Sequence, residues 1–329
     1  MLLRDQKLGK YKIISPLGTG GFGSVYLAVD TWIDKQVALK VPHRQNINFG
    51  ELLREPRLLA TLNHPNIIAI TTAEKQENLF FIVMEYVQGE TLENLINSKG
   101  TIPINHALDY AIQTCRAVQH AHTQGVLHRD LRPPNMLVSE EGLVKVADFG
   151  TSRFVELSTK GTTVIGSPPY MAPEQFEGKA TFASDIYALG VTIYQMLTGG
   201  LPYNTPSPSD LDRLMRGELF EPPRARNSSI PSSLNEIIMK AMNPYSENRY
   251  QSANELLTAL ENTRDRRVQY LSMNQDYAKS TPQVNNSPPS EQEISKTPNP
   301  DDNTTQFCWH CHKPLHARND RCPFCDEIQ

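Results

Sequence analysis

The sequence predicts an α+β fold of two lobes, a small β-rich lobe followed by a larger helical lobe. Residues 11–87 alternate apolar and polar positions around glycine-rich turns, as in YKIISPLG, SVYLAVD, QVALKV and LFFIVMEY, a pattern typical of strands. One helical pattern, ELLREPRLLATL at 51–62, interrupts these strands. After about residue 89 the apolar residues recur at helical spacing, as in HALDYAIQTCRAVQHAH and SANELLTALENTR. Strands followed by helices indicate two packed lobes.

Composition indicates an ordinary globular protein in a reducing compartment. The chain has 329 residues, 39% of them hydrophobic and 21% charged, and a net charge of −4, which argues against nucleic-acid or anionic-membrane partners. The start, MLLRDQKLGKYK, has no apolar run long enough for a secretory signal. The apolar segment 186–197 is too short for a membrane span and is expected to be a buried core helix. We therefore expect a cytoplasmic protein.

Composition changes again toward the C-terminus. Residues 263–306 are rich in Ser, Pro, Asn, Gln and charge without periodicity, which predicts a disordered linker. Residues 307–329 form a separate cysteine-rich unit.

A glycine cluster in LGTGGFGSVYLA predicts a phosphate-binding hairpin. Gly18, Gly20 and Gly23 follow the G-x-G-x-x-G pattern, which by itself also fits a simple turn. A dinucleotide-binding fold needs a helix after the glycines, but SVYLAVD alternates like a strand. A P-loop needs Lys after the last glycine, where this chain has Ser24. Lys40 ends the apolar strand VALK and would supply a point charge for phosphates rather than a solvated surface charge.

The ordered set of motifs resembles the eukaryotic-like protein kinases. GTGGFGSV, VALK, HPNI, MEYVQGETL, HRDLRPPN, DFG, APE and SDIYALG occur in that family's order and cover about 11–262. YMAPEQ looks most like the bacterial serine/threonine branch. The resemblance implies a bilobal kinase fold, with an N-lobe at about 11–84, a hinge at 85–88 and a C-lobe at 89–262.

The resemblance also implies the catalytic set. Asp130 matches the carboxylate that orients the substrate hydroxyl and accepts its proton, whereas Asn135 and Asp148 match the ligands of Mg²⁺, with Mn²⁺ as an alternative. Lys40 would pair with Glu55. Arg132 departs from the usual lysine, but it keeps a cation that can grip phosphate oxygens, so activity is expected to survive with a changed rate.

Pro56 is a second departure. Proline is tolerated at the start of a helix but costs about 3 kcal/mol in its interior, so the helix either begins near Pro56 or is kinked there. The Lys40–Glu55 pair is therefore expected to be less secure, with Glu51 as a substitute partner. We hypothesise a mobile helix whose seating is a regulatory step.

By the same resemblance, ATP would lie between apolar side chains and under the glycine hairpin, with backbone groups of the hinge contacting adenine. The residues implied are Leu17, Gly18, Thr19, Gly20, Gly21, Phe22, Gly23, Ser24, Val25, Ala38, Lys40, Met84, Glu85, Val87 and Leu137.

Regulation and scaffolding are implied for a further set of residues. Arg129 would clamp a phosphate on the activation segment, residues 148–174, with Thr159, Thr162 and Thr163 as candidate acceptors or as plain solvated loop residues. Three structural residues are Glu174, Arg249 and Asp185, the first two as an ion pair. His120 and His122 are expected to pack or cap a helix, and Cys115 to be inert core.

The C-terminal cysteines predict a structural zinc site. Cys308, Cys311, Cys322 and Cys325 form C-x₂-C-x₁₀-C-x₂-C, a spacing typical of one tetrahedral Zn²⁺, and the tail looks like a zinc ribbon. The rival hypothesis is that the four cysteines form two disulfides. Three nearby histidines are alternative zinc ligands, and redox sensing by the thiols is a minor alternative function. The ribbon would contact the kinase or recruit a partner that its sequence does not identify.

The leading prediction is an ATP- and Mg²⁺-dependent protein kinase that phosphorylates Ser or Thr of proteins, including its own activation segment after self-association. One alternative is a pseudokinase scaffold that binds nucleotide and recruits partners through the ribbon. It is disfavoured because Lys40, Asp130, Asp148 and Asn135 are all present. A small-molecule kinase is disfavoured by APE and the full activation segment.

Overall fold

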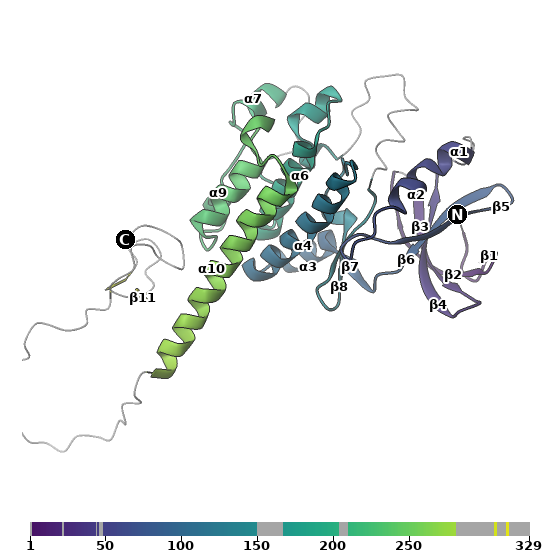
Figure 1. Cartoon of the computed structure of the whole chain (residues 1–329), viewed down its shortest axis with the longest axis horizontal. Helices are drawn as coiled ribbons and strands as arrows, with labels where there is room; N and C mark the ends of the chain where they lie inside the picture. Colours follow the sequence, from purple (N-terminus) through teal and green to yellow (C-terminus); the bar gives the residue numbers. More distant parts are fainter. Residues whose placement is uncertain are drawn as a thin grey trace, which may run out of the picture.

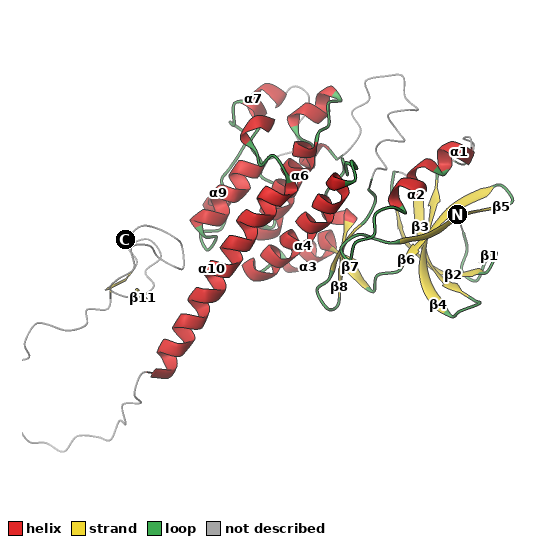
Figure 2. Cartoon of the chain, in the orientation of Figure 1, coloured by secondary structure: helices red, strands yellow, loops and turns green. Residues whose placement is uncertain are grey.

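The computed structural model describes residues 2–21, 23–43, 45, 49–149, 167–203, 210–280, 306–307 and 314–315. Figure 1 shows a curled sheet formed by the first part of the chain beside a larger group of helices formed by the rest, and Figure 2 shows how clearly strands and helices are segregated. The predicted two-lobed α+β arrangement is confirmed.

The N-lobe contains one antiparallel sheet with the strand order β1-β2-β3-β4-β6-β5. Its strands are β1 (Lys7–Leu8), β2 (Tyr11–Thr19), β3 (Gly23–Asp30), β4 (Lys35–Pro42), β5 (Ile70–Gln76) and β6 (Leu79–Glu85). One face buries an apolar cluster that includes Tyr11, Leu39 and Val83. Because side chains alternate along a strand, other residues of the same strands, such as Lys40 on β4 and Phe80 on β6, lie on the opposite face, where the short helices pack.

Two short helices, rather than one, occupy the predicted helical segment at 51–62. Helix α1 spans Phe49–Leu52, and α2 spans Arg54–Leu59, with a turn at Leu53 between them. Leu52 packs with Phe80 and Ile82 of β6. Pro56 is the third residue of α2 and has no N–H to donate to the carbonyl four residues earlier, at Leu52, which explains the interruption.

The C-lobe is built around α6 (Phe182–Thr198), whose residues from Ile186 to Leu197 are almost entirely buried. The predicted core helix at 186–197 is thus confirmed. The elements around it are α3 (Leu92–Lys99), α4 (Ile104–Thr123), η2 (Pro168–Tyr170), η3 (Pro173–Glu177), α7 (Leu211–Met215), α8 (Pro223–Arg226), α9 (Ser232–Ala241), η5 (Ser246–Asn248) and α10 (Ala253–Ser280). Cys115 of α4 is fully buried in the same core, and burial raises the pKa of its thiol, in line with the predicted inert role.

A small antiparallel sheet at the lobe junction carries residues 127–135, the catalytic loop implied by the resemblance. Its strands are β7 (Gly89–Thr91), β8 (Met136–Ser139) and β9 (Val144–Val146). The short helix η1 (Pro133–Asn135) leads directly into β8. Because β8 and β9 are antiparallel, residues 127–135, which precede β8, come next to residues 147–149, which follow β9.

The prediction of an unstructured linker over 263–306 was wrong for residues 263–280, which are helical. Helix α10 continues to Ser280 and projects beyond the other helices of the lobe (Figure 1). Arg267 donates to Asn105 at 2.8 Å, and Arg264 lies 3.9 Å from Asp109, so polar contacts with the first turns of α4 extend the packed helix past 262. Residues 263–280, although polar in composition, are therefore part of a helix and not of a linker.

Two further strands pair near the C-terminus. β10 (Gln306–Phe307) and β11 (Pro314–Leu315) are antiparallel, with Phe307 opposite Pro314. The rest of the predicted linker, 281–305, and the four predicted zinc ligands lie outside the described residues. Within the described ranges, no helix combines the length and apolar character required to cross a bilayer.

Candidate active site

The glycine motif forms the predicted hairpin between β2 and β3. Thr19 is paired with Ser24, and the N–H of Gly20 donates to the carbonyl of Gly23 at 3.0 Å. Gly23 is required by packing, because a Cβ there would lie 2.5 Å from the carbonyl oxygen of Val41 on β4. Phe22 lies outside the described residues.

Strand register places Lys40 beneath this hairpin. Lys40 on β4 is opposite Val25 on β3 and opposite Ile82 on β6, and it is only 5% exposed. Its Nζ donates to Oδ1 of Asp148 at 2.7 Å. The central strand of the N-lobe and the segment after β9 are therefore joined by a charged hydrogen bond.

The apolar residues predicted to hold the base come from both lobes. Ala38 on β4 is opposite Met84 on β6, and Leu17 and Val25 lie on the hairpin above them. Leu137 comes from β8. These side chains range from 7% exposed for Ala38 to 46% exposed for Leu17, and their contact with a nucleotide base stays a prediction.

The hinge is fixed by Glu85. Its side-chain Oε1 accepts both the backbone N–H of Ala69 and the Nζ of Lys145, each at 2.7 Å. Lys145 lies on β9, so this ion pair connects the last strand of the N-lobe sheet to the strand that leads to Asp148.

Asp130 is held by Asn135. The Nδ2 of Asn135 donates to the backbone oxygen of Asp130 at 2.8 Å and to its Oδ2 at 3.1 Å. Arg132 points its Nε at the same Oδ2 from 3.5 Å. Because η1 begins with two prolines, the five-residue spacing closes into a stiff loop that returns Asn135 to Asp130.

Asp185 anchors the preceding backbone from within the C-lobe. Its Oδ2 accepts the N–H of His128 at 2.9 Å, and its Oδ1 accepts the N–H of Arg129 at 2.8 Å. His122 Nε2 lies 2.8 Å from Oδ2. Burial opposes ionisation of Asp185, but the hydrogen bonds from His122 and from the backbone outweigh burial and lower the pKa of Asp185.

His128 connects the catalytic loop to the segment after β9. Its Nε2 bonds the carbonyl of Ala147 at 2.9 Å, and its Nδ1 accepts the N–H of Asp130 at 3.3 Å. Accepting at Nδ1 requires the neutral ring to carry its proton on Nε2, which then donates to Ala147. The ring also packs on Phe149, with ring centroids 4.6 Å apart.

Asp148 combines a special backbone conformation with a lowered pKa. Its φ is 61°, in the left-handed region that few non-glycine residues adopt. Burial disfavours its charge, but the Lys40 ammonium and the more distant Arg132 guanidinium outweigh burial and lower the pKa. Asp148 is therefore ionised at neutral pH.

Glu174 and Arg249 form the predicted ion pair beneath the site. Arg249 is fully buried at its side chain and donates to both carboxylate oxygens of Glu174, at 2.7 and 2.9 Å. Its remaining donors bond backbone carbonyls, and Ser184 donates to Glu174 at 2.6 Å. This cluster fixes the segment 172–175 against α6.

Several predicted residues lie outside what the structure describes. These are the side chains of Glu51 and Glu55, the candidate phosphate acceptors and the zinc ligands, namely Glu51, Glu55, Thr159, Thr162, Thr163, Cys308, Cys311, Cys322 and Cys325. Across the described part of the chain, no cluster of three or more His, Cys, Asp or Glu side chains could hold a metal ion. The lobe junction instead offers a carboxylate and an amide, Asp148 and Asn135.

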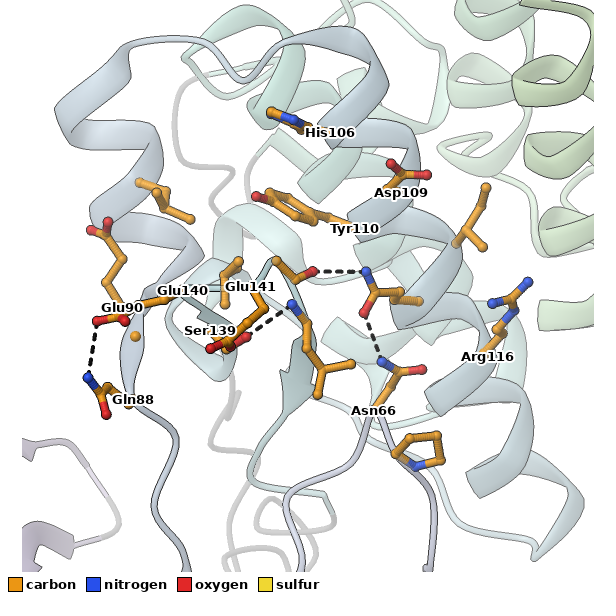
Figure 3. A pocket seen from close by; sticks show the side chains of 18 of the residues that line it. Asn66, Gln88, Glu90, His106, Asp109, Tyr110, Arg116, Ser139, Glu140 and Glu141 are labelled. Atoms are coloured by element: carbon orange, nitrogen blue, oxygen red, sulfur yellow. Dashed lines mark hydrogen bonds between the residues drawn. The ribbon is translucent and has the colours of Figure 1, made fainter. Parts of the chain in front are cut away.

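A cavity of about 1260 Å³ lies away from these catalytic groups, between α4 on one side and β7 with the β8–β9 hairpin on the other (Figure 3). None of the predicted catalytic residues lines it. Two of the polar residues that line this cavity already bond within the chain, because Asn66 donates to Gln113 at 3.0 Å and to the carbonyl of Val144 at 2.9 Å. A much smaller cavity is lined by Lys40, Asp148 and Phe149 together with Leu59 of α2.

A family model described as "Protein kinase domain" matches residues 11–260. The chain belongs to the protein kinase family. It is similar to a probable serine/threonine-protein kinase of Clostridium perfringens, at 39% identity over 77% of this chain and 38% of that protein. It is also similar to the serine/threonine-protein kinases PrkC of Bacillus subtilis, at 36% identity over 78% of this chain and 41% of that one, and PknB of Mycobacterium tuberculosis, at 35% over 75% and 42%. The chain thus spans about two fifths of the length of these relatives.

A solved structure has the same kinase fold. The crystal structure of Rad53 1-466 in complex with AMP-PNP matches with a TM-score of 0.66 and 26% identity, covering 75% of this chain and 64% of that one. The kinase fold is therefore supported by sequence and by structure.

Three contacts of this kinase domain were missed by sequence reasoning. His122 was expected only to pack or cap, but it bonds Asp185. Lys145 and Gln175 were not singled out, yet they bond Glu85 and the carbonyl of Arg129. Each joins residues at least 46 positions apart, and no local pattern marks such pairs.

Proposed function

We propose that the protein is an ATP-dependent serine/threonine protein kinase. The observation that carries the proposal is the meeting of Asp130, held by Asn135, with the Lys40–Asp148 pair at the lobe junction. The names of the relatives, all serine/threonine-protein kinases at 35–39% identity, support the same activity and not the scaffold alternative. The chain matches only about two fifths of the length of those proteins, so we also propose, on the same grounds, that its substrates are proteins with Ser or Thr acceptors.

In the proposed reaction a protein Ser or Thr oxygen forms a bond to the γ-phosphorus of ATP as the bond to the β,γ-bridging oxygen breaks, releasing ADP. Asp130 orients the attacking hydroxyl and takes its proton. Lys40 pairs with the phosphates, and Arg132 places a second cation close to Asp130. At Gly20 and Gly21 an added Cβ would meet no atom within 4 Å, which leaves the hairpin backbone open to close approach by phosphate oxygens.

Asn135 and Asp148 fit the Mg²⁺ that this chemistry uses. Both supply hard oxygen ligands, and Asn135 directs its Nδ2 at Asp130, which leaves its side-chain oxygen turned away from that carboxylate. These two residues would hold Mg²⁺, or Mn²⁺, whose charge when bound offsets that of the phosphate oxygens.

The test is phosphate transfer from labelled ATP to a generic protein acceptor, with site mapping. We expect transfer by the wild-type chain and a loss of about 10²-fold or more in Asp130→Asn, because the general base is removed while the shape is kept. Glu177→Gln, on the exposed surface of η3, is the control and should match the wild type. Equal labelling by Asp130→Asn and the wild type would overturn the proposal.

We further propose that the chain phosphorylates its own activation segment, after self-association of two copies. Arg129 would pair with a phosphate on Thr159, Thr162 or Thr163, since arginine and a doubly charged phosphate make strong hydrogen bonds. Mass spectrometry after incubation with ATP is the test. Phosphate on none of the three, in chain that phosphorylates an added protein, would reject this step alone.

We propose that residues 307–329 form a zinc ribbon that docks a partner protein, joined through residues after Ser280. The C-x₂-C-x₁₀-C-x₂-C spacing supports it, as does the pairing of β10 with β11 on either side of Cys308 and Cys311. Four reduced thiolates also favour a cytoplasmic setting. Metal analysis of the full chain should give one zinc per chain, lost in a Cys322→Ser and Cys325→Ser double variant. Zinc-free protein with two disulfides would contradict the ribbon.

A further inference from the structure

Gln175 bridges two segments whose relative position matters for catalysis. It lies in η3, and its Oε1 accepts the N–H of Ala172 at 2.9 Å while its Nε2 donates to the carbonyl of Arg129 at 3.1 Å. The reverse amide orientation would place like atoms together at both contacts, so these partners determine the orientation. One side chain thus joins the end of the activation segment to the catalytic loop.

The carbonyl that Gln175 holds belongs to the peptide just before Asp130. That peptide's other end, the N–H of Asp130, is held by His128 at 3.3 Å, and the next carbonyl, that of Asp130, by Asn135 at 2.8 Å. Every backbone hydrogen-bonding group around the Asp130 Cα therefore has a partner. Of the residues that supply these partners, only Gln175 lies in the segment that follows the activation segment.

Arg129 makes this support necessary. Its φ is 69°, a left-handed conformation that costs a non-glycine residue free energy and persists where its surroundings hold it. Asp185 holds its N–H at 2.8 Å, and Gln175 holds its carbonyl. Loss of the hydrogen bond to this carbonyl would remove one restraint on the peptide, and rotation of the peptide would move the Asp130 carboxylate.

We propose that Gln175 is a positioning residue for Asp130, coupling the placement of residues 172–175 to the orientation of the catalytic carboxylate. The inference rests on the proposed kinase activity. Among the described residues, Gln175 hydrogen-bonds only backbone groups of Ala172 and Arg129, so it acts through the peptide and not on substrate.

Two substitutions separate positioning from general packing. Gln175→Met keeps the length and removes both hydrogen bonds. Gln175→Glu keeps the acceptor for Ala172 but sets a carboxylate against the Arg129 carbonyl, which is repulsive until the carboxylate is protonated. A protonated carboxyl has the donor and acceptor pattern of the amide, so it restores both bonds. Glu177→Gln on the same short helix, whose carboxylate contacts only exposed Lys179 among the described residues, is the matched control.

The experiment measures nucleotide affinity, then kcat and KM for transfer to casein, from pH 8 to about pH 5.5, on full-length chain. We expect unchanged nucleotide affinity and a kcat about tenfold lower for Gln175→Met, the order of one lost hydrogen bond, with Gln175→Glu lower still at pH 8. The deficit of Gln175→Glu relative to wild type should shrink as the pH falls, while that of Gln175→Met stays constant.

Three outcomes would overturn the assignment: a Gln175→Met kcat within twofold of Glu177→Gln, parallel losses of nucleotide affinity and kcat, or a deficit of Gln175→Glu that ignores pH. An inactive wild-type chain would instead reject the proposed function, so the two failures are distinguishable.

Discussion

The ammonium of Lys40 lies 2.7 Å from the Oδ1 of Asp148, joining the N-lobe sheet to the loop after β9. Lys40 is almost buried, with a side chain 7% exposed, so its charge depends on such partners. The pair places a cation and a metal-binding carboxylate at the same point of the lobe junction.

Lys40→Met should therefore lower kcat by about 10²–10³-fold, the usual effect of removing one group that stabilises developing charge. The pKa of Asp148 should rise toward its ordinary value, because the nearest cation that lowers it is gone. Steady-state kinetics against ATP checks the first effect, with Lys35→Met, an exposed lysine at the start of β4, as control. Turnover of Lys40→Met within threefold of that control would contradict it.

The Glu174–Arg249 pair predicts a specific pH dependence of stability. Burial works against the charge of Glu174, but Arg249 and Ser184 outweigh burial and lower the pKa below its ordinary 4.5. A lowered folded-state pKa means that the stabilisation is fully present above the unfolded-state value and is lost as the pH falls through the folded one. Glu174→Gln should cost about 3 kcal/mol at neutral pH, as breaking buried pairs does.

Urea unfolding of wild type and Glu174→Gln between pH 7 and about pH 3.5 tests this expectation. The difference in unfolding free energy should be constant down to about pH 5.5 and should narrow below pH 4.5 as Glu174 is protonated. A difference that grows on acidification has the wrong sign and would show that Glu174 is not charged in the folded chain.

The hinge contact between Glu85 and Lys145 should contribute measurably to stability. Its side chains are 27% and 14% exposed, intermediate between surface and buried pairs, so we expect a coupling energy of about 1 kcal/mol. A double-mutant cycle with Glu85→Gln and Lys145→Met measures it, and Gln keeps an acceptor for Ala69. The exposed Lys179–Glu177 pair, 2.8 Å apart, is the control and should couple less. Equal coupling energies in the two pairs would mean that partial burial does not strengthen the ion pair between Glu85 and Lys145.

The residue pattern alone predicts the parts of this fold that are encoded locally, whereas the Glu174–Arg249 pair, 75 positions apart, was predicted only from the family resemblance. The hairpin of Gly18–Gly23 follows from strand alternation around a glycine turn, and Asp130 and Asn135 meet because two prolines stiffen a five-residue loop. By contrast, the Gln175–Arg129 and His122–Asp185 bonds span 46 and 63 positions and depend on how η3, α4 and α6 pack. Helix α10 shows the same limit, since its first turn past 262 contacts α4 through Arg264 and Arg267, and a polar composition does not reveal such contacts.

Pro56 supplies a prediction about local helix structure. Because proline lacks the N–H that would bond the Leu52 carbonyl, Pro56→Ala should let α1 and α2 join into one helix from Phe49 to Leu59. Amide hydrogen exchange, followed by mass spectrometry on peptides covering 49–60, should then become slower, since exchange reports local opening. Pro65→Ala, a loop proline outside both helices, is the control and should leave that exchange unchanged. Unaltered exchange in Pro56→Ala would mean that the turn at Leu53 is set by the packing of Leu52 on Phe80 and Ile82, not by the missing donor.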